Sequence, residues 1–167
     1  PIISVGSTPT AIHAKSFDGV SEVRPGVYMF QDLFQAGIGS CEVSNLALSV
    51  LATVISSQPE RKTFMLDAGG LALSKDRSTA GFNFDAGFGL VADLKGDLIG
   101  NLRVDRVHQE HGEVTAQDLN IFAQLPVGSK VRIYPNHACM TAAAYDAYSV
   151  VDNGTMVIDT WPRCNGW

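Results

Sequence analysis

Apolar and polar residues alternate along much of the chain, and this alternation predicts β-strands. From Leu98 to Val107, apolar side chains at even positions alternate with polar neighbours, which is typical of a strand with one buried face. Gly100 within it indicates a bulge or a close backbone approach. The same alternation recurs at residues 130–134. Residues 46–56, rich in branched apolar side chains, and residues 62–66 indicate two buried strands.

The last part of the chain predicts a β-hairpin. Residues 148–151 and 156–161 flank residues 152–155, whose Asn-Gly pair supplies the positive φ angles of a tight turn. Val114-Thr115 extends the sheet. Two short helices are predicted, at residues 118–124 and 141–148. Because so many short strands need their edges covered, the sequence predicts a mainly β fold, an antiparallel sheet closed or nearly closed into a barrel.

Length and charge exclude several classes of protein. A folded chain of 167 residues is one domain's worth and buries roughly 70% of its extended surface, enough for a core without disulfides. The net charge is −5 and the twelve Lys and Arg residues are scattered, so we expect no nucleic-acid partner. No stretch resembles a signal peptide or approaches about eighteen apolar residues, so we expect no membrane partner.

The three cysteines are an odd number at unrelated spacings, which favours a reduced, cytoplasmic protein over a disulfide framework. We expect Cys41 to be a core residue and Cys164 a tail residue. The chain also begins without methionine, inside residues 1–6, which have the pattern of a buried strand running into a glycine turn. Since chains rarely begin inside a core strand, we expect a piece of something longer.

Two glycine turns near the start suggest a phosphate site. Gly6-Ser7-Thr8-Pro9-Thr10 follows the first short strand, and small hydroxyl residues with backbone amides on a tight turn form a phosphate cradle. Residues 21–30 indicate a second strand, interrupted at Gly26. In a parallel sheet both turns would lie side by side and offer N–H groups to one anion. The alternative is that both are ordinary loop glycines.

The segment from Tyr134 to Thr141 suggests a metal site. In an extended or looped backbone residues i and i+2 point to the same side, so His137 and Cys139 can bind one ion together at a strand end. Zinc usually has three or four protein ligands, so a pair leaves open positions for water or substrate. The alternative is a capped histidine beside a small buried cysteine.

Short motifs spread from Ser4 to Trp167 resemble, in this order, those of the D-threonine aldolase and D-serine dehydratase family of metal-dependent pyridoxal phosphate enzymes: GSTPT, EVRPGVYMFQD, LDAGGLALSKD, GFG, QEHGEV, PNHAC and WPRCNGW. The resemblance implies a two-domain enzyme, in which an alanine racemase-type (β/α)₈ barrel holds the cofactor and a β domain follows. Residues 1–33 then correspond to the last two strands of that barrel, and residues 34–167 to the β domain with the metal site.

The resemblance also implies roles for residues of the first segment. RPGVY looks like the turn in which the backbone amides of Gly26 and Val27 hold the cofactor phosphate, with hydroxyl groups of Ser7 and Thr8 contributing. Arg24 occupies the position that in alanine racemase faces the pyridine nitrogen.

PNHAC matches the metal motif, with His137 and Cys139 as the implied ligands. The dehydratases show H-x-C, whereas the aldolases commonly show H-x-D. A thiolate favours zinc and a carboxylate favours manganese, so zinc is expected here, with manganese as the alternative. The implied reaction is lyase chemistry on a β-hydroxy D-amino acid, with dehydration of D-serine favoured over retro-aldol cleavage of D-threonine.

Three further expectations follow. EHG belongs to the family pattern, so His111 is a candidate for a catalytic role near the metal. Asp67 is expected to be a structural turn residue. The lysine that carries the cofactor is expected in the preceding barrel. The lysines of this chain do not lie in a matching motif: Lys15, Lys62, Lys75, Lys95 and Lys130. The isolated chain is therefore expected to be inactive.

Enzymes of this architecture usually pair two subunits, so a homodimer of the full-length enzyme is expected. A competing interpretation is a non-catalytic β module that binds metal or mediates dimerisation, which the missing lysine favours. A metal-dependent hydrolase of another family is a third possibility, which the presence of only two clustered ligands disfavours.

Overall fold

A computed structural model describes residues 1–152 and 154–165. Its ten strands are β1 (Ser4–Gly6), β2 (Glu22–Arg24), β3 (Val50–Gln58), β4 (Thr63–Leu66), β5 (Leu90–Ala92), β6 (Leu98–Val107), β7 (Gly112–Thr115), β8 (Lys130–Tyr134), β9 (Ala147–Val151) and β10 (Val157–Pro162). The α-helices are α1 (Thr8–His13), α2 (Leu33–Gly37), α3 (Gly70–Leu73), α4 (Asn120–Gln124) and α5 (Ala138–Ala142). Three 3₁₀ turns are η1 (Val27–Met29), η2 (Val43–Asn45) and η3 (Pro59–Arg61).

Six strands form a closed barrel in the order β3-β4-β7-β6-β5-β8, and every neighbouring pair is antiparallel. Closure pairs the first of these strands with the last, because Val50 of β3 lies opposite Ile133 of β8. The expected mainly β fold with a closed antiparallel barrel is confirmed. Closure leaves the barrel without a free sheet edge.

The barrel interior is an apolar core built from inward-facing side chains. Val54, Phe64 and Ile133 are at most 1% exposed, and Phe64 meets Phe122 of α4 edge to face at 6.1 Å between ring centroids. β3 was expected to be continuously buried and to start at residue 46. Instead it starts at Val50 and alternates, with Leu51 63% exposed, because successive side chains of a barrel strand point inside and outside.

The strand predicted at residues 98–107 is confirmed as β6, and so is the irregularity at Gly100. Leu90 and Ala92 are two positions apart on β5. Their partners on β6, Arg103 and Leu98, are five positions apart. The extra residues bulge out, and Gly100 has a φ of +54°, a conformation that costs glycine little. The predicted extension at residues 114–115 is β7.

The first thirty residues form a small unit of their own, in which β1 and β2 run parallel and α1 connects them. The parallel pairing agrees with the prediction, but two details were wrong. Residues 1–6 are not buried: Ile2 is 84% and Ile3 49% exposed, and Val5 and Gly6 of β1 are only half-buried, because β1 pairs with β2 alone among the described residues. The second strand ends at Arg24, since Pro25 has no N–H to continue the ladder and η1 follows.

The C-terminal hairpin is present as the antiparallel pair β9 and β10, and it forms a separate two-stranded sheet outside the barrel. Asn153 of its predicted turn lies outside the described residues. The helix predicted at residues 118–124 is confirmed as α4. The helix predicted at residues 141–148 was wrong, since α5 begins earlier, at Ala138, and β9 begins at Ala147.

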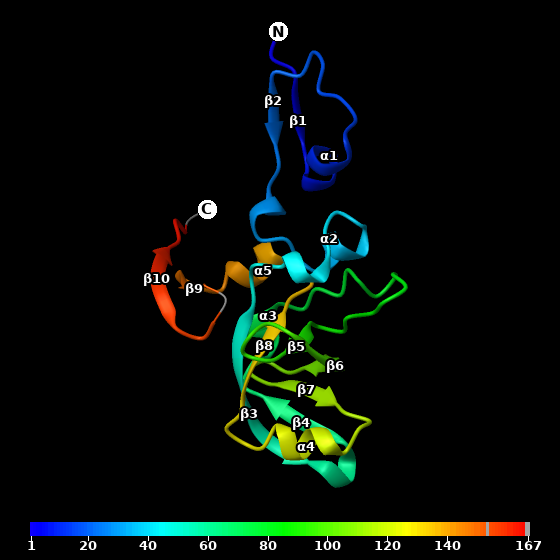
Figure 1. Cartoon of the computed structure of the whole chain (residues 1–167), viewed down its shortest axis with the longest axis vertical. Coiled ribbons are helices and arrows are strands. Elements are labelled where there is room, and N and C mark those ends of the chain that lie inside the picture. Colours follow the sequence, from blue (N-terminus) through cyan, green and yellow to red (C-terminus); the bar gives the residue numbers. More distant parts are fainter. Residues whose placement is uncertain (153, 166–167) are drawn as a thin grey trace.

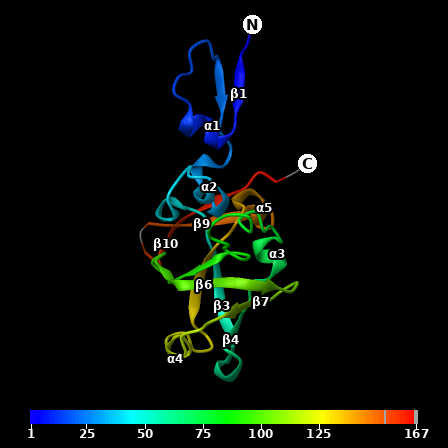
Figure 2. The same ribbon diagram turned by 90° about the vertical axis from the view of Figure 1, so that its right-hand side faces the viewer.

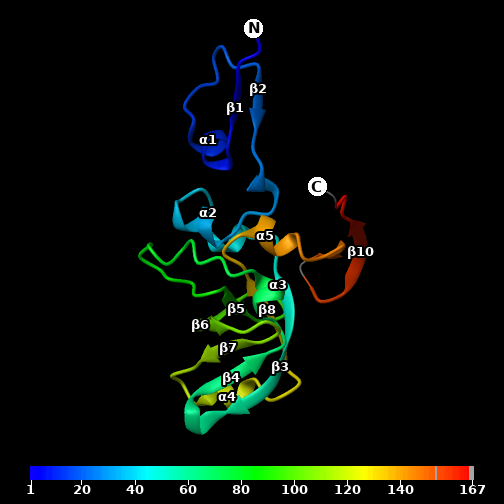
Figure 3. The ribbon, with the colours of Figure 1, turned by 180° about the vertical axis from the view of Figure 1, so that it is seen from behind.

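The elements are arranged along one long axis (Figure 1). In all three views α2 and α5 lie between the β1-α1-β2 unit and the barrel, whereas α4 covers the opposite end of the barrel (Figures 1, 2 and 3). The hairpin projects to one side next to α5 (Figures 1 and 3). Among the described residues, no helix is both long and apolar enough to cross a membrane.

Two leucines test the barrel interior. Leu66 is fully buried whereas Leu51 is 63% exposed on the outer face. We expect Leu66→Ala to lower the free energy of unfolding by about 2–5 kcal/mol, because it leaves a cavity in the core. Leu51→Ala makes the same chemical change and should stay within about 0.5 kcal/mol. Urea unfolding measures both, and equal losses would contradict the described orientation of the strands.

Candidate functional site

His137 and Cys139 lie where β8 gives way to α5. His137 has an extended backbone (φ −137°, ψ 99°) and is the residue just before the helix, while Cys139 is in its first turn. An extended or looped segment through both residues was expected, and this was wrong because the helix begins at Ala138, between them. Both side chains remain accessible: the His137 side chain is 42% exposed and Cys139 is classed as exposed. Both donors are therefore open to solvent at the end of a barrel strand.

Among residues 1–152 and 154–165, no group of three or more His, Cys, Asp or Glu side chains could hold a metal ion together.

The start of α5 is tied to α2 by one buried carboxylate, which the sequence did not reveal. Asp32 is 3% exposed; its Oδ2 accepts from the amide of Ala138 (3.0 Å) and its Oδ1 from the amide of Gln35 (2.9 Å). Burial raises the pKa of Asp32 although both amides oppose this. Asp32 thus caps two helices at once and fixes the turn that carries His137 and Cys139.

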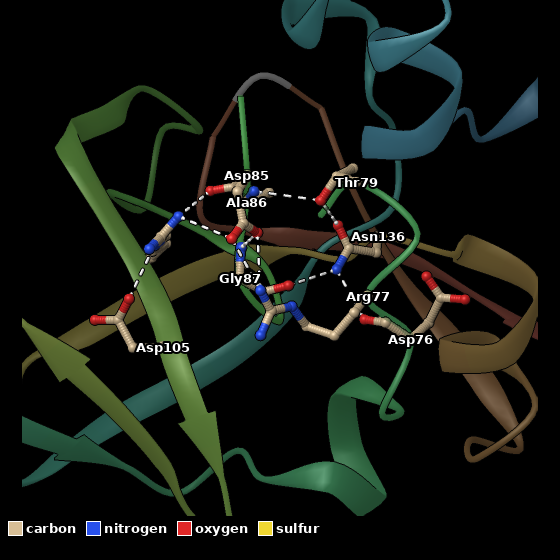
Figure 4. Close-up of polar contacts among 9 residues, drawn as sticks. Asp76, Arg77, Thr79, Asp85, Ala86, Gly87, Asp105 and Asn136 are labelled. Atoms are coloured by element: carbon tan, nitrogen blue, oxygen red, sulfur yellow. Dashed lines mark hydrogen bonds and ion pairs between the residues drawn. The ribbon is translucent and has the colours of Figure 1, made fainter. Parts of the chain in front are cut away.

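On the other side of this turn the buried amide of Asn136 holds the loop between α3 and β5 (Figure 4). Its Nδ2 donates to the backbone oxygens of Asp76 (2.8 Å) and Gly87 (2.7 Å), and its Oδ1 accepts from the hydroxyl of Thr79 (2.8 Å). The Thr79 hydroxyl in turn accepts from the amide of Ala86 (3.2 Å). Every polar atom of the Asn136 side chain is used, so these hydrogen bonds join the loop to the turn that carries His137 and Cys139.

A charged cluster continues this network toward the barrel wall (Figure 4). The carboxylate of Asp85 lies 2.9 Å from Arg77 and 3.5 Å from Arg103, and Arg103 also contacts Asp105 at 2.8 Å. The amide of Gly87 donates to Asp85, and together with the two arginines it lowers the pKa of this carboxyl. The cluster fixes the loop to β6.

Asp76 is the residue of this loop closest to the candidate metal ligands. Its Oδ2 lies 3.6 Å from Nδ1 of His137, and its side chain is 18% exposed. Burial opposes ionisation, but hydrogen bonding from Ser78 and the nearby His137 lower the pKa of Asp76. Asp76 ends the motif LDAGGLALSKD, but it lies about sixty residues from the histidine, and the motif did not indicate this contact.

The predicted phosphate site brings together the two glycine turns. Gly6 at the end of β1 lies opposite Arg24 at the end of β2, so the segments that follow both strands start side by side. The Thr8 side chain is 2% exposed, and its Oγ1 has no hydrogen-bond partner among the described residues. The Ser7 Oγ accepts from the amide of Thr10 (3.2 Å). A buried hydroxyl without a partner at this place fits a phosphate oxygen.

The other residues predicted for this site lie close by. Gly26 is the residue just before η1, which begins at Val27, so both amides belong to the first turn after β2. Arg24 is mostly exposed; its Nε donates to the hydroxyl of Ser4 (2.7 Å) and lies 3.6 Å from Glu22.

His111 lies at the turn between β6 and β7, not on the metal turn. The His111 side chain is exposed, and its backbone oxygen accepts from the amide of His108 (2.8 Å). The backbone of this turn docks on α3, because Gly70 donates to His108. α3 in turn contacts α5 through the hydroxyl of Thr141, which donates to the backbone of Leu73. His111 is therefore one element removed from α5.

Other predicted residues have structural roles. Asp67 accepts from the amide of Thr53 and so joins β3 to the end of β4, as expected of a structural residue. Cys41 is half-buried against a second apolar cluster around Leu33, and Cys164 is exposed. Two hollows of about 300 and 420 Å³ lie on the barrel wall, and neither is lined by a predicted site residue.

The closed barrel beside a parallel β-α-β unit places the chain among alanine racemase-like proteins. With the crystal structure of an alanine racemase-like protein from Idiomarina loihiensis it shares 44% sequence identity and a TM-score of 0.93, over 99% of this chain and 44% of that one. The family model described as "Putative serine dehydratase domain" matches residues 47–151, and the chain belongs to that family.

Two relatives with assigned activities match nearly the whole chain. The D-threo-3-hydroxyaspartate dehydratase of Delftia sp. (strain HT23) is 44% identical over 100% of this chain and 45% of its own length. The D-serine dehydratase of Dictyostelium discoideum is 36% identical over 99% of this chain and 43% of its own length. The chain therefore spans less than half the length of these dehydratases.

Structures of the Delftia enzyme superpose on the chain with a TM-score of 0.92. They include one variant in which a histidine is replaced by alanine and another, in the metal-free form, in which a cysteine is replaced by alanine.

Asp85 makes the stability of the site depend on pH. Its pKa is lowered below the ordinary 3.8, so the stabilisation by its charge is present above that value and is lost as the pH falls through the lowered pKa. We expect Asp85→Asn to lower the Tm at about pH 7 and to approach the wild type at about pH 2.5. Exposed Asp18→Asn is the control and should differ little at either pH. A pH-independent loss in Asp85→Asn would contradict the role of the charge.

Proposed function

We propose that this chain is the metal-binding β domain, with part of the cofactor barrel, of a pyridoxal phosphate-dependent lyase that dehydrates β-hydroxy D-amino acids. Two relatives with assigned activities are dehydratases, and their substrates by name, D-serine and D-threo-3-hydroxyaspartate, are both such amino acids. D-serine is the first candidate, and D-threo-3-hydroxyaspartate is the second because the enzyme named for it is 44% identical to this chain. Dehydration is favoured over retro-aldol cleavage by the thiol at position 139.

The observation that carries the proposal is the accessible pair His137 and Cys139 on one rigid turn. In the Delftia enzyme the substituted histidine and cysteine are two positions apart, the same spacing as His137 and Cys139 here, and the structure of the cysteine variant is of its metal-free form. An imidazole and a soft thiolate suit zinc better than manganese. A zinc ion held there would act as a Lewis acid on the β-hydroxyl of the substrate, which makes hydroxide a better leaving group.

The first segment of the chain supports binding of the cofactor phosphate. The partnerless hydroxyl of Thr8 and the amides of Gly26 and Val27 are the proposed donors, with Ser7 beside them. Pyridoxal phosphate, when bound, supplies an electron sink for the charge that develops at Cα. The part of this chain is to hold the phosphate end and so orient the ring. We keep Arg24 as the proposed neighbour of the ring nitrogen and His111 as a proposed active-site residue.

Several aspects of the full-length protein stay predictions: the division at residue 33, the homodimer and the cytoplasmic location. The second candidate function is a non-catalytic β module that binds metal or mediates dimerisation. It is favoured by the five lysines, none of which lies in a motif suited to the cofactor.

Zinc binding tests the metal site. We expect the purified chain to bind one equivalent of zinc, and His137→Ala or Cys139→Ala to weaken binding by at least about 100-fold, because each removes one of two protein ligands. His108→Ala and Cys164→Ala remove the same exposed chemical groups elsewhere and should bind like the wild type. Competition titration with a fluorescent chelator gives the affinities. A wild-type chain that binds no zinc would leave the non-catalytic module as the better description.

Activity tests the need for the rest of the enzyme. With added zinc and pyridoxal phosphate, we expect the 167-residue chain to turn over neither D-serine nor D-threonine nor D-threo-3-hydroxyaspartate, because no lysine is in place to anchor the cofactor. The Delftia enzyme serves as positive control, and release of the keto acid or aldehyde product is the measurement. Turnover by the isolated chain would refute this expectation.

A further inference from the structure

His137 presents its two ring nitrogens to different surroundings. Nδ1 faces Oδ2 of Asp76 at 3.6 Å, and Nε2 lies on the opposite edge of the ring. In neutral imidazole one nitrogen carries the proton and the other has the lone pair that can bind a metal. Which nitrogen carries the proton is decided by the hydrogen bond that the ring makes.

We propose that Asp76 is a positioning residue for His137: its carboxylate accepts the Nδ1 proton and thereby reserves Nε2 for the divalent cation. The inference rests on the proposed metal site and adds to it a residue that lies outside the motif PNHAC. The distance of 3.6 Å is longer than a hydrogen bond of up to about 3.2 Å. Because the imidazole is half-exposed, a small rotation of the ring would close this gap.

Asp76 is held in place for this role by its own contacts. Its Oδ1 accepts from the amide of Ser78 (2.9 Å), its amide donates to the hydroxyl of Ser74 (3.2 Å), and its backbone oxygen accepts from Asn136 (2.8 Å). In Figure 4 the carboxylate points away from the Asn136 side chain, whereas the backbone oxygen faces it. Oδ1 is thus used within the loop, and Oδ2 is the atom presented to His137.

Asp32 is the other carboxylate whose charge reaches His137, but it cannot orient the ring in the same way. Both of its oxygens already accept from backbone amides, those of Gln35 and Ala138. The Asp76 carboxylate lies near Nδ1, the ring nitrogen that the proposal leaves free of the metal.

Zinc affinity and the histidine tautomer together test the inference on the full 167-residue chain. We expect Asp76→Ala to weaken zinc binding by about 10–100-fold, the usual effect of removing the hydrogen-bond partner of a metal-bound histidine. Asp76→Asn keeps a neutral acceptor and should recover part of this loss. Nitrogen-15 NMR should show His137 protonated at Nδ1 in the zinc-bound wild type and in Asp76→Asn, and a mixture of tautomers in Asp76→Ala.

Asp85→Asn is the matched control, because Asp85 lies in the same loop and holds it through Arg77 and Arg103 without facing His137. It should lower the Tm and leave the zinc affinity unchanged. Equal zinc affinity in the wild type and in Asp76→Ala would overturn the inference but would leave the proposed metal site unaffected. An equal loss of affinity in Asp85→Asn would assign the effect to loop integrity and overturn it as well. A wild-type chain that binds no zinc would instead overturn the proposed metal site itself.

Discussion

The need to satisfy one buried amide organises the candidate site. Asn136 is 1% exposed, and its side chain can stay there only if its donor and acceptor atoms find partners. It finds them in Asp76, Gly87 and Thr79, which belong to a loop far away in the sequence. The loop therefore lies against the residue that precedes His137. Asp32 secures the other side of the same turn, so the candidate ligands stand on a support fixed from two directions.

Closure of the barrel makes that support rigid. β8 is paired on both sides, by β3 and β5, so the strand that ends just before the metal turn has little freedom to move. Side chains fill the interior of the barrel, and the candidate site lies at the end of the barrel next to α2 and α5 (Figures 1 and 3). This is the end that faces the β1-α1-β2 unit with the proposed phosphate donors. The arrangement separates a stable scaffold from an accessible site.

The exposure of His137 and Cys139 bears on the kind of metal site that they could form. A structural zinc site encloses the ion with four protein ligands, whereas two exposed donors leave positions for a substrate oxygen. Selectivity must then come from the identity of the donors and from the groups that orient them. In the proposed site Cys139 would contribute the first, and the carboxylates around His137 the second. The charged cluster at Asp85 joins the same loop to β6.

The sequence by itself determined the local features: the bounds of β6, the bulge at Gly100, the hairpin and the proximity of His137 to Cys139, because alternation, glycine and short spacing act within a few residues. It misjudged the start of α5, since Asp32 caps that helix from 106 positions away. It also misjudged the burial of β1, which depends on which strands are its neighbours. Only the tertiary structure brought Asp76 to His137 and Thr79 to Asn136. Such contacts join residues about sixty positions apart through the folding of a loop without periodicity, and no pattern along the chain encodes where that loop packs.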